Sequence, residues 1–84
     1  MPQHMPRTGD ITVNVIRDGF LIGRILEHIG AGPWWQYIAT AKSLDIALAI
    51  ARQFAAAANV RAWLRPDERG DYTEIAIRPT DDSL

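Results

Sequence analysis

The spacing of the apolar residues changes twice along the chain, and these changes constrain the fold more than any other feature. Apolar and polar residues alternate over residues 11–26 and again over residues 60–78. Between these segments, residues 44–58 follow the 3.6-residue period of an amphipathic helix. We therefore predict an α+β domain with the element order β-β-β-α-β-β, a mostly antiparallel sheet of about five strands with one helix packed on one face.

An Asp18-Gly19 pair separates the first two apolar runs. Such a pair favours a type I′ hairpin turn, because both residues tolerate a positive φ. With the pair in the turn, Ile11 is expected opposite Leu26, and Arg24 interrupts the more apolar face. The predicted core face of this hairpin carries Ile11, Val13, Val15, Ile22 and Leu26.

Residues 34–39 are rich in aromatic and β-branched side chains and predict a third strand. Successive side chains of a strand point to opposite faces. We therefore expect one of Trp34 and Trp35 in the core and the other facing outward or against a partner.

The helix is predicted to begin after Ser43, a good N-cap, and to end at Asn59, which tolerates the left-handed conformation. Its broad apolar stripe is expected to face the sheet. This stripe consists of Leu44, Ala47, Ile50, Ala51, Phe54 and Ala58.

Residues 60–65 and 72–78 alternate again and form a second predicted hairpin. Its outward face combines arginine with aromatic rings and also carries Glu74 and Ala76. The outward arginines and aromatics are Arg61, Trp63, Arg65, Tyr72 and Arg78.

Arginine interleaved with aromatic rings on a sheet is typical of three kinds of surface. Protein interfaces use these residue types as energetic anchors. Single-stranded nucleic-acid platforms stack bases on the rings and contact phosphates with the guanidinium groups. On an ordinary solvated sheet, arginine stems simply lie over the rings.

Charge favours a protein partner over nucleic acid. Residues 66–84 hold six acidic and two basic groups, which weaken any attraction of phosphate to this hairpin. We therefore expect a protein partner or a second copy of the chain, a homodimer, with Trp34 and Trp35 joining the binding surface. A single-stranded nucleic-acid or DNA-binding module remains the alternative.

Reactive side chains are too few to write a catalytic mechanism. The chain has no cysteine, and its two histidines, His4 and His28, lack an evident nucleophile or orienting group. The acidic residues within 67–71 lack the spacing of a calcium loop, and the glycines of residues 30–32 precede a strand rather than a helix. We expect no enzyme, no catalytic residue, no metal and no cofactor, and instead an adaptor, subunit or inhibitor that acts by surface binding.

The chain is long enough for one domain. We interpret residues 1–10, with two prolines, as a flexible arm, residues 11–78 as the folded domain and residues 79–84 as a polar tail. No apolar run approaches the ~18 residues of a membrane helix, and the N-terminus lacks the apolar stretch of a secretory signal. A cytoplasmic location without membrane attachment is the expectation.

Residues 37–52 resemble the strand–helix junction of several small bacterial β-β-α-β domains. The layout of three strands before a helix is also similar to plant ethylene-response-type DNA-binding domains. The basic and aromatic strand residues with which the plant domains read DNA have no recognisable counterparts here. The resemblance therefore implies neither a function nor a site residue.

Overall fold

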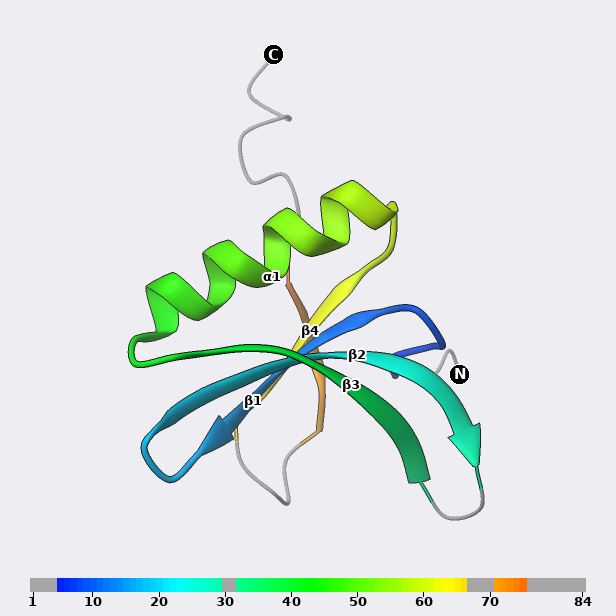
Figure 1. Cartoon of the computed structure of the whole chain (residues 1–84), viewed down its shortest axis with the longest axis horizontal. Coiled ribbons are helices and arrows are strands. Elements are labelled where there is room, and N and C mark those ends of the chain that lie inside the picture. Colours follow the sequence, from blue (N-terminus) through cyan, green and yellow to red (C-terminus); the bar gives the residue numbers. More distant parts are fainter. Residues whose placement is uncertain (1–4, 30–31, 67–70, 76–84) are drawn as a thin grey trace.

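The computed structural model describes residues 5–29, 32–66 and 71–75, and these residues form one sheet and one helix (Figure 1). The elements are β1 (Ile11–Ile16), β2 (Gly19–Ile29), β3 (Gly32–Ala41), α1 (Leu44–Ala58), β4 (Ala62–Arg65) and β5 (Thr73–Ile75). The sheet has the order β3-β2-β1-β4-β5, and only β1 and β4 are parallel neighbours in it. The predicted α+β class is confirmed.

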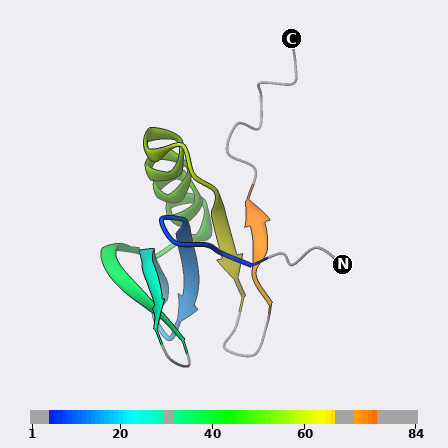
Figure 2. The same cartoon turned by 90° about the vertical axis from the view of Figure 1, so that its right-hand side faces the viewer.

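Figure 2 shows the helix over one face of the sheet, with β3 and β5 at opposite edges. α1 packs mainly on β1 and β2 and connects β3 to β4, which run in the same direction. The β3–α1–β4 connection has the usual right-handed sense. The sense follows from Ile11, whose N–H points to β4 while its side chain packs under the helix. Because the chirality of an L-residue relates these two directions to the direction of the strand, they fix the side of β1 on which β4 lies. The opposite face of the sheet carries no helix of the described chain.

The first hairpin differs from the prediction in its register. Ile16 pairs with Gly19, so the two-residue connection is Arg17-Asp18 rather than Asp18-Gly19. Gly19 (φ +149°) belongs to β2, where its bare Cα lies against the backbone of Ala41 and leaves no room for a Cβ. The paired residues slip by two positions, which keeps every side chain on its predicted face.

The slip explains which predicted core residues of the hairpin are buried. Ile11, Val13 and Ile22 are fully buried beneath α1, as expected. Leu26 is exposed, because Ile11 pairs with Arg24 and β2 continues past the start of β1. Val15, near the turn, is also exposed, so the prediction was wrong for these two residues.

β3 follows β2 irregularly, with register shifts between Ile22 and Gly23 and again between Ile25 and Glu27. The side chain of Trp35 is exposed, whereas that of Trp34 lies outside the described part of the structure. The expectation that one tryptophan of this pair is buried therefore stays a prediction.

Both ends of α1 agree with the prediction, but its orientation does not. Ser43 Oγ accepts a hydrogen bond of 3.3 Å from the Ile46 N–H, and Asn59 ends the helix with φ 58° and ψ 46°. The residues fully buried against the sheet are Ala47, Ala51 and Ala55. Three methyl groups in a row let the helix approach the sheet closely, which longer side chains in these positions would prevent.

The larger apolar residues of the predicted stripe consequently lie to the sides of the contact. Leu44 and Phe54 are exposed, and Ile50 is half-buried. The last residue of the predicted stripe, Ala58, is exposed as well, so the expectation that Leu44, Phe54 and Ala58 face the sheet was wrong.

Candidate interaction surfaces

The register of the strands sets which residues share the sheet face opposite α1. Trp63 of β4 lies between Thr12 of β1 and Glu74 of β5, and in the next row Arg65 lies beside Asn14. Alternation along β4 therefore predicted the correct face for Trp63 and Arg65. It did not predict whether that face is covered.

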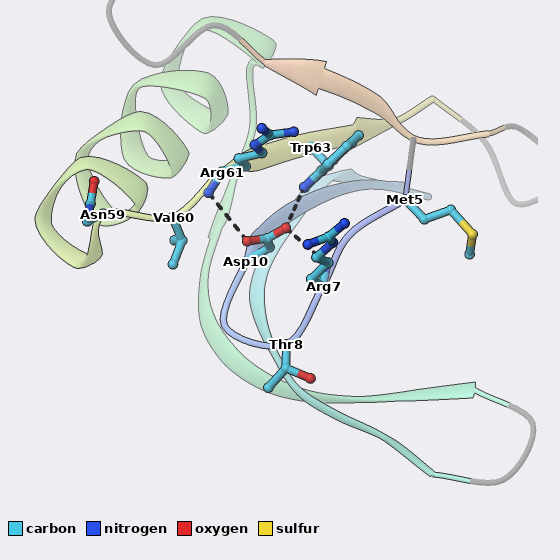
Figure 3. Close-up of a pocket in the computed structure, with 8 residues that line it drawn as sticks. All are labelled: Met5, Arg7, Thr8, Asp10, Asn59, Val60, Arg61 and Trp63. Atoms are coloured by element: carbon cyan, nitrogen blue, oxygen red, sulfur yellow. Dashed lines mark hydrogen bonds between the residues drawn. The ribbon is translucent and has the colours of Figure 1, made fainter. Parts of the chain in front are cut away.

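Trp63 is buried, with 2% of its surface exposed. Its indole Nε1–H donates a hydrogen bond of 2.9 Å to Asp10 Oδ2 (Figure 3). The prediction that Trp63 faces solvent or a partner was wrong, because residues 5–10 pack beside it. A ring in this position is unavailable for stacking on a base or for anchoring a partner.

Asp10 fixes the N-terminal segment to the sheet. Its carboxylate accepts hydrogen bonds from the backbone N–H of Arg7 (2.9 Å), the backbone N–H of Arg61 (3.3 Å) and the indole of Trp63. The Gly9 N–H also donates to the carbonyl of Ile25. Residues 5–10 are therefore not a loose arm in this structure.

The role of Asp10 was not predicted from the sequence, although the sequence carries a local signal for it. The sequence Thr8-Gly9-Asp10 is typical of a turn, and Gly9 adopts a φ of +95°. The Asp10 N–H closes this turn on the Arg7 carbonyl at 2.9 Å.

The remaining outward residues of the second hairpin contact one another. Arg61 Nε lies 3.6 Å from Glu74 Oε2 in an exposed ion pair, and the Arg65 guanidinium lies 5.6 Å from the centre of the Tyr72 ring. The Tyr72 hydroxyl donates to Asn14 Oδ1 at 3.2 Å. Local contacts of this kind are typical of an ordinary solvated sheet, the third kind of surface considered for this hairpin. Arg78 lies outside the described residues.

A pocket of about 310 Å³ opens between the N-terminal segment and the end of α1 (Figure 3). It is lined by Met5, Arg7, Thr8, Asp10, Asn59, Val60, Arg61 and Trp63. Both carboxylate oxygens of Asp10 already accept hydrogen bonds from the protein. Within the described residues, moreover, no group of three or more His, Cys, Asp or Glu side chains is placed to hold a metal ion.

β3 forms an edge of the sheet and presents exposed aromatic side chains. Trp35 is 37% exposed and Tyr37 is 65% exposed, both on the face opposite α1. The ten residues of β3 include no charged side chain. An exposed edge strand of this length usually carries a charge or is covered, because its free N–H and C=O groups can pair with another strand.

Apolar side chains of α1 lie on the flank nearest to β3. The residues that precede the three buried alanines are Ile46, Ile50 and Phe54, of which Ile46 is 54% and Phe54 39% exposed. Because α1 is right-handed and runs opposite to β1, the residue before each buried alanine lies toward β3 and the residue after it toward β4. The charged residues of α1, Asp45 and Arg52, lie away from this flank.

The β3 edge and this flank of α1 lie on the same side of the molecule, and neither contains a charged residue; together we term them the β3-side surface. It comprises Trp35, Tyr37, Ile46, Ile50 and Phe54. Of these residues, Trp35 is expected from the sequence at the binding surface, whereas Ile50 and Phe54 are expected from their spacing to face the sheet.

Comparison with protein-family models, curated proteins and solved structures finds no match to this chain. Among the described residues, no helix has the length and apolar character needed to cross a membrane.

Proposed function

We propose that this chain is a non-enzymatic protein-interaction module that binds its partner through the β3-side surface. The observation that carries the proposal is the coincidence of a long uncharged edge strand with exposed apolar residues on the nearest flank of the helix. The sequence places most of the expected binding residues on β4 and β5. The surface proposed here lies instead on β3 and α1, and Trp35 belongs to both.

Physical chemistry supports this surface in two ways. An edge strand offers backbone donors and acceptors in a fixed row, which an added strand can satisfy. A partner that covers the exposed apolar side chains beside that row, such as Tyr37 and Ile46, removes them from water, which stabilises the complex. An adaptor, a subunit or an inhibitor can each act in this way without chemistry of its own.

The nucleic-acid alternative has less support from the described residues. Its stacking ring, Trp63, is buried and hydrogen-bonded to Asp10. Arg61 lies beside Glu74, and Arg65 lies over Tyr72. Phosphate would have to compete with these contacts.

Site-directed photo-crosslinking tests the proposal. Benzoylphenylalanine replaces Tyr37 in one version of the full chain and exposed Ala56, on the other side of α1, in a matched control. In cells of the source organism, position 37 is expected to give discrete protein adducts and position 56 none. Adducts at position 37 with nucleic acid alone, or equal protein adducts at both positions, would contradict the proposal.

A further inference from the structure

We propose that the partner is a second copy of this chain and that two copies pair antiparallel along β3, forming one continuous sheet across a twofold axis. The inference rests on the proposed function, since it names the occupant of the β3-side surface. Three observations on the described residues support it: the direction of the free backbone groups, the self-complementarity of the strand and the position of α1.

Backbone hydrogen bonds show which residues of β3 have free groups. The Ile25 N–H donates to the Asp10 carbonyl, and the Ile25 carbonyl accepts from Gly9, so the backbone groups of Ile25 point away from β3. Ile25 is opposite Trp35, and in an antiparallel ladder such a pair is not hydrogen-bonded. The N–H and C=O of Trp35 therefore point to the outer edge, as do those of Tyr37 two residues later.

These free groups select one register for self-pairing. Hydrogen-bonded pairs form only between residues whose groups both point across the joint. Pairing Trp35 with its own copy would place Tyr37 opposite Pro33, which has no N–H. Pairing Tyr37 with its own copy would place Trp35 opposite Ala39, which pairs with Ile22 after the register shift and points its groups to β2.

The remaining register places Trp35 of each copy opposite Tyr37 of the other. Both residues then exchange backbone hydrogen bonds, and their rings lie side by side on the face opposite α1, a favourable cross-strand pair. Gln36 lies on the twofold axis and faces Gln36 of the other copy. One contact therefore occurs twice, as a closed twofold interface requires.

The position of α1 also fits a second copy. A twofold axis perpendicular to the sheet keeps both helices on the same face. The flanks that carry Ile46, Ile50 and Phe54 then point toward each other across the joint. Neither these flanks nor the two β3 strands contain a charged residue, so they cause no repulsion between like charges. The other described edge strand, β5, is short and carries Glu74 between its two other residues.

The oligomeric state of the purified full chain, with variants, tests the inference. Sedimentation velocity is expected to show a concentration-dependent dimer. Tyr37→Lys places a charge on the joint and is expected to raise the dimer Kd by at least about tenfold. Ile46→Glu should weaken the dimer as well while retaining the fold, because Glu three residues after the Ser43 N-cap completes a capping box. Ala56→Glu, the control on the other flank, should leave the Kd unchanged.

A cysteine crosslink tests the register, since the natural chain has no cysteine. In the proposed pair, Gln36 of one copy faces Gln36 of the other at a non-hydrogen-bonded position, where Cα atoms lie about 4.5 Å apart, within disulfide range. Mild oxidation of Gln36→Cys should give a covalent dimer, while Thr40→Cys, also exposed on β3, should not.

The outcomes separate this inference from the proposed function. A monomer at high concentration, or a dimer that Tyr37→Lys and Ile46→Glu leave intact, overturns self-pairing. If position 37 still crosslinks to a different protein, the interaction function stands without self-pairing. If position 37 gives no protein adduct and the chain is monomeric, both proposals fail.

Discussion

The Trp63 indole donates a 2.9 Å hydrogen bond to the Asp10 carboxylate, joining residues 53 apart in the sequence. The same carboxylate accepts the backbone N–H groups of Arg7 and Arg61. A single side chain therefore connects the N-terminal segment, the start of β1 and the start of β4 on the face that α1 does not cover.

Replacing Asp10 should destabilise the fold even when the new side chain has nearly the same size. In Asp10→Asn, one carboxylate oxygen becomes an NH₂ group that faces donors. A buried donor left without an acceptor costs about 1–3 kcal/mol, so we expect a loss of about 2 kcal/mol in the free energy of unfolding. Urea denaturation measures this loss. Asp18→Asn, in the exposed β1–β2 turn, is the control and should change stability little.

Gly19 should not tolerate a side chain. Its φ of +149° is rare for other residues, and a Cβ there would overlap the Ala41 backbone. We expect Gly19→Ala to lower the free energy of unfolding by at least about 2 kcal/mol, through strain and displacement of β3. Thermal unfolding followed by circular dichroism measures the effect. An unchanged melting temperature would contradict the close approach of Gly19 to the Ala41 backbone.

The spacing between α1 and the sheet depends on the buried alanines. Ala51→Leu inserts three carbons into a fully packed contact and should cost about 1–3 kcal/mol. Ala49→Leu makes the same change at an exposed position of the same helix and should be close to neutral. Equal effects of the two substitutions in urea denaturation would contradict the observed orientation of α1.

Asn59 should be replaceable by glycine but not by alanine. It holds the left-handed conformation that ends α1, with its N–H directed at the Ala55 and Ala56 carbonyls. The left-handed conformation costs roughly 1–2 kcal/mol for an ordinary residue, and glycine avoids this cost. Asn59→Ala should therefore lower stability by about 1 kcal/mol while Asn59→Gly changes it little. The reverse order in denaturant midpoints would contradict this cap geometry.

Local patterns predicted the elements of this fold because each element carries its own signal. Alternation marked the strands, and Ser43 and Asn59 marked the ends of the helix. The register of the first hairpin was wrong by two residues because the prediction placed Gly19 in the turn. Its actual constraint is a close approach to Ala41, which is distant in sequence.

The candidate site was harder to predict because it depends on how elements pack. The apolar stripe of α1 is broad enough to permit several rotations, and the close fit of Ala47, Ala51 and Ala55 selects one that leaves Phe54 exposed. Trp63 was assigned to the correct face, but the segment that covers it has no apolar periodicity. Neither result can be read from a single element.

Residue-resolved amide hydrogen exchange of the full chain tests the central claim most directly, because it reports on the backbone groups assigned to binding. The Trp35 and Tyr37 N–H groups should exchange rapidly in dilute solution and become protected as concentration rises. The Gln36 N–H, which points to β2, should be protected throughout. Rapid exchange at Trp35 and Tyr37 at concentrations where the chain is fully associated would contradict the assignment of the β3 edge as the binding surface.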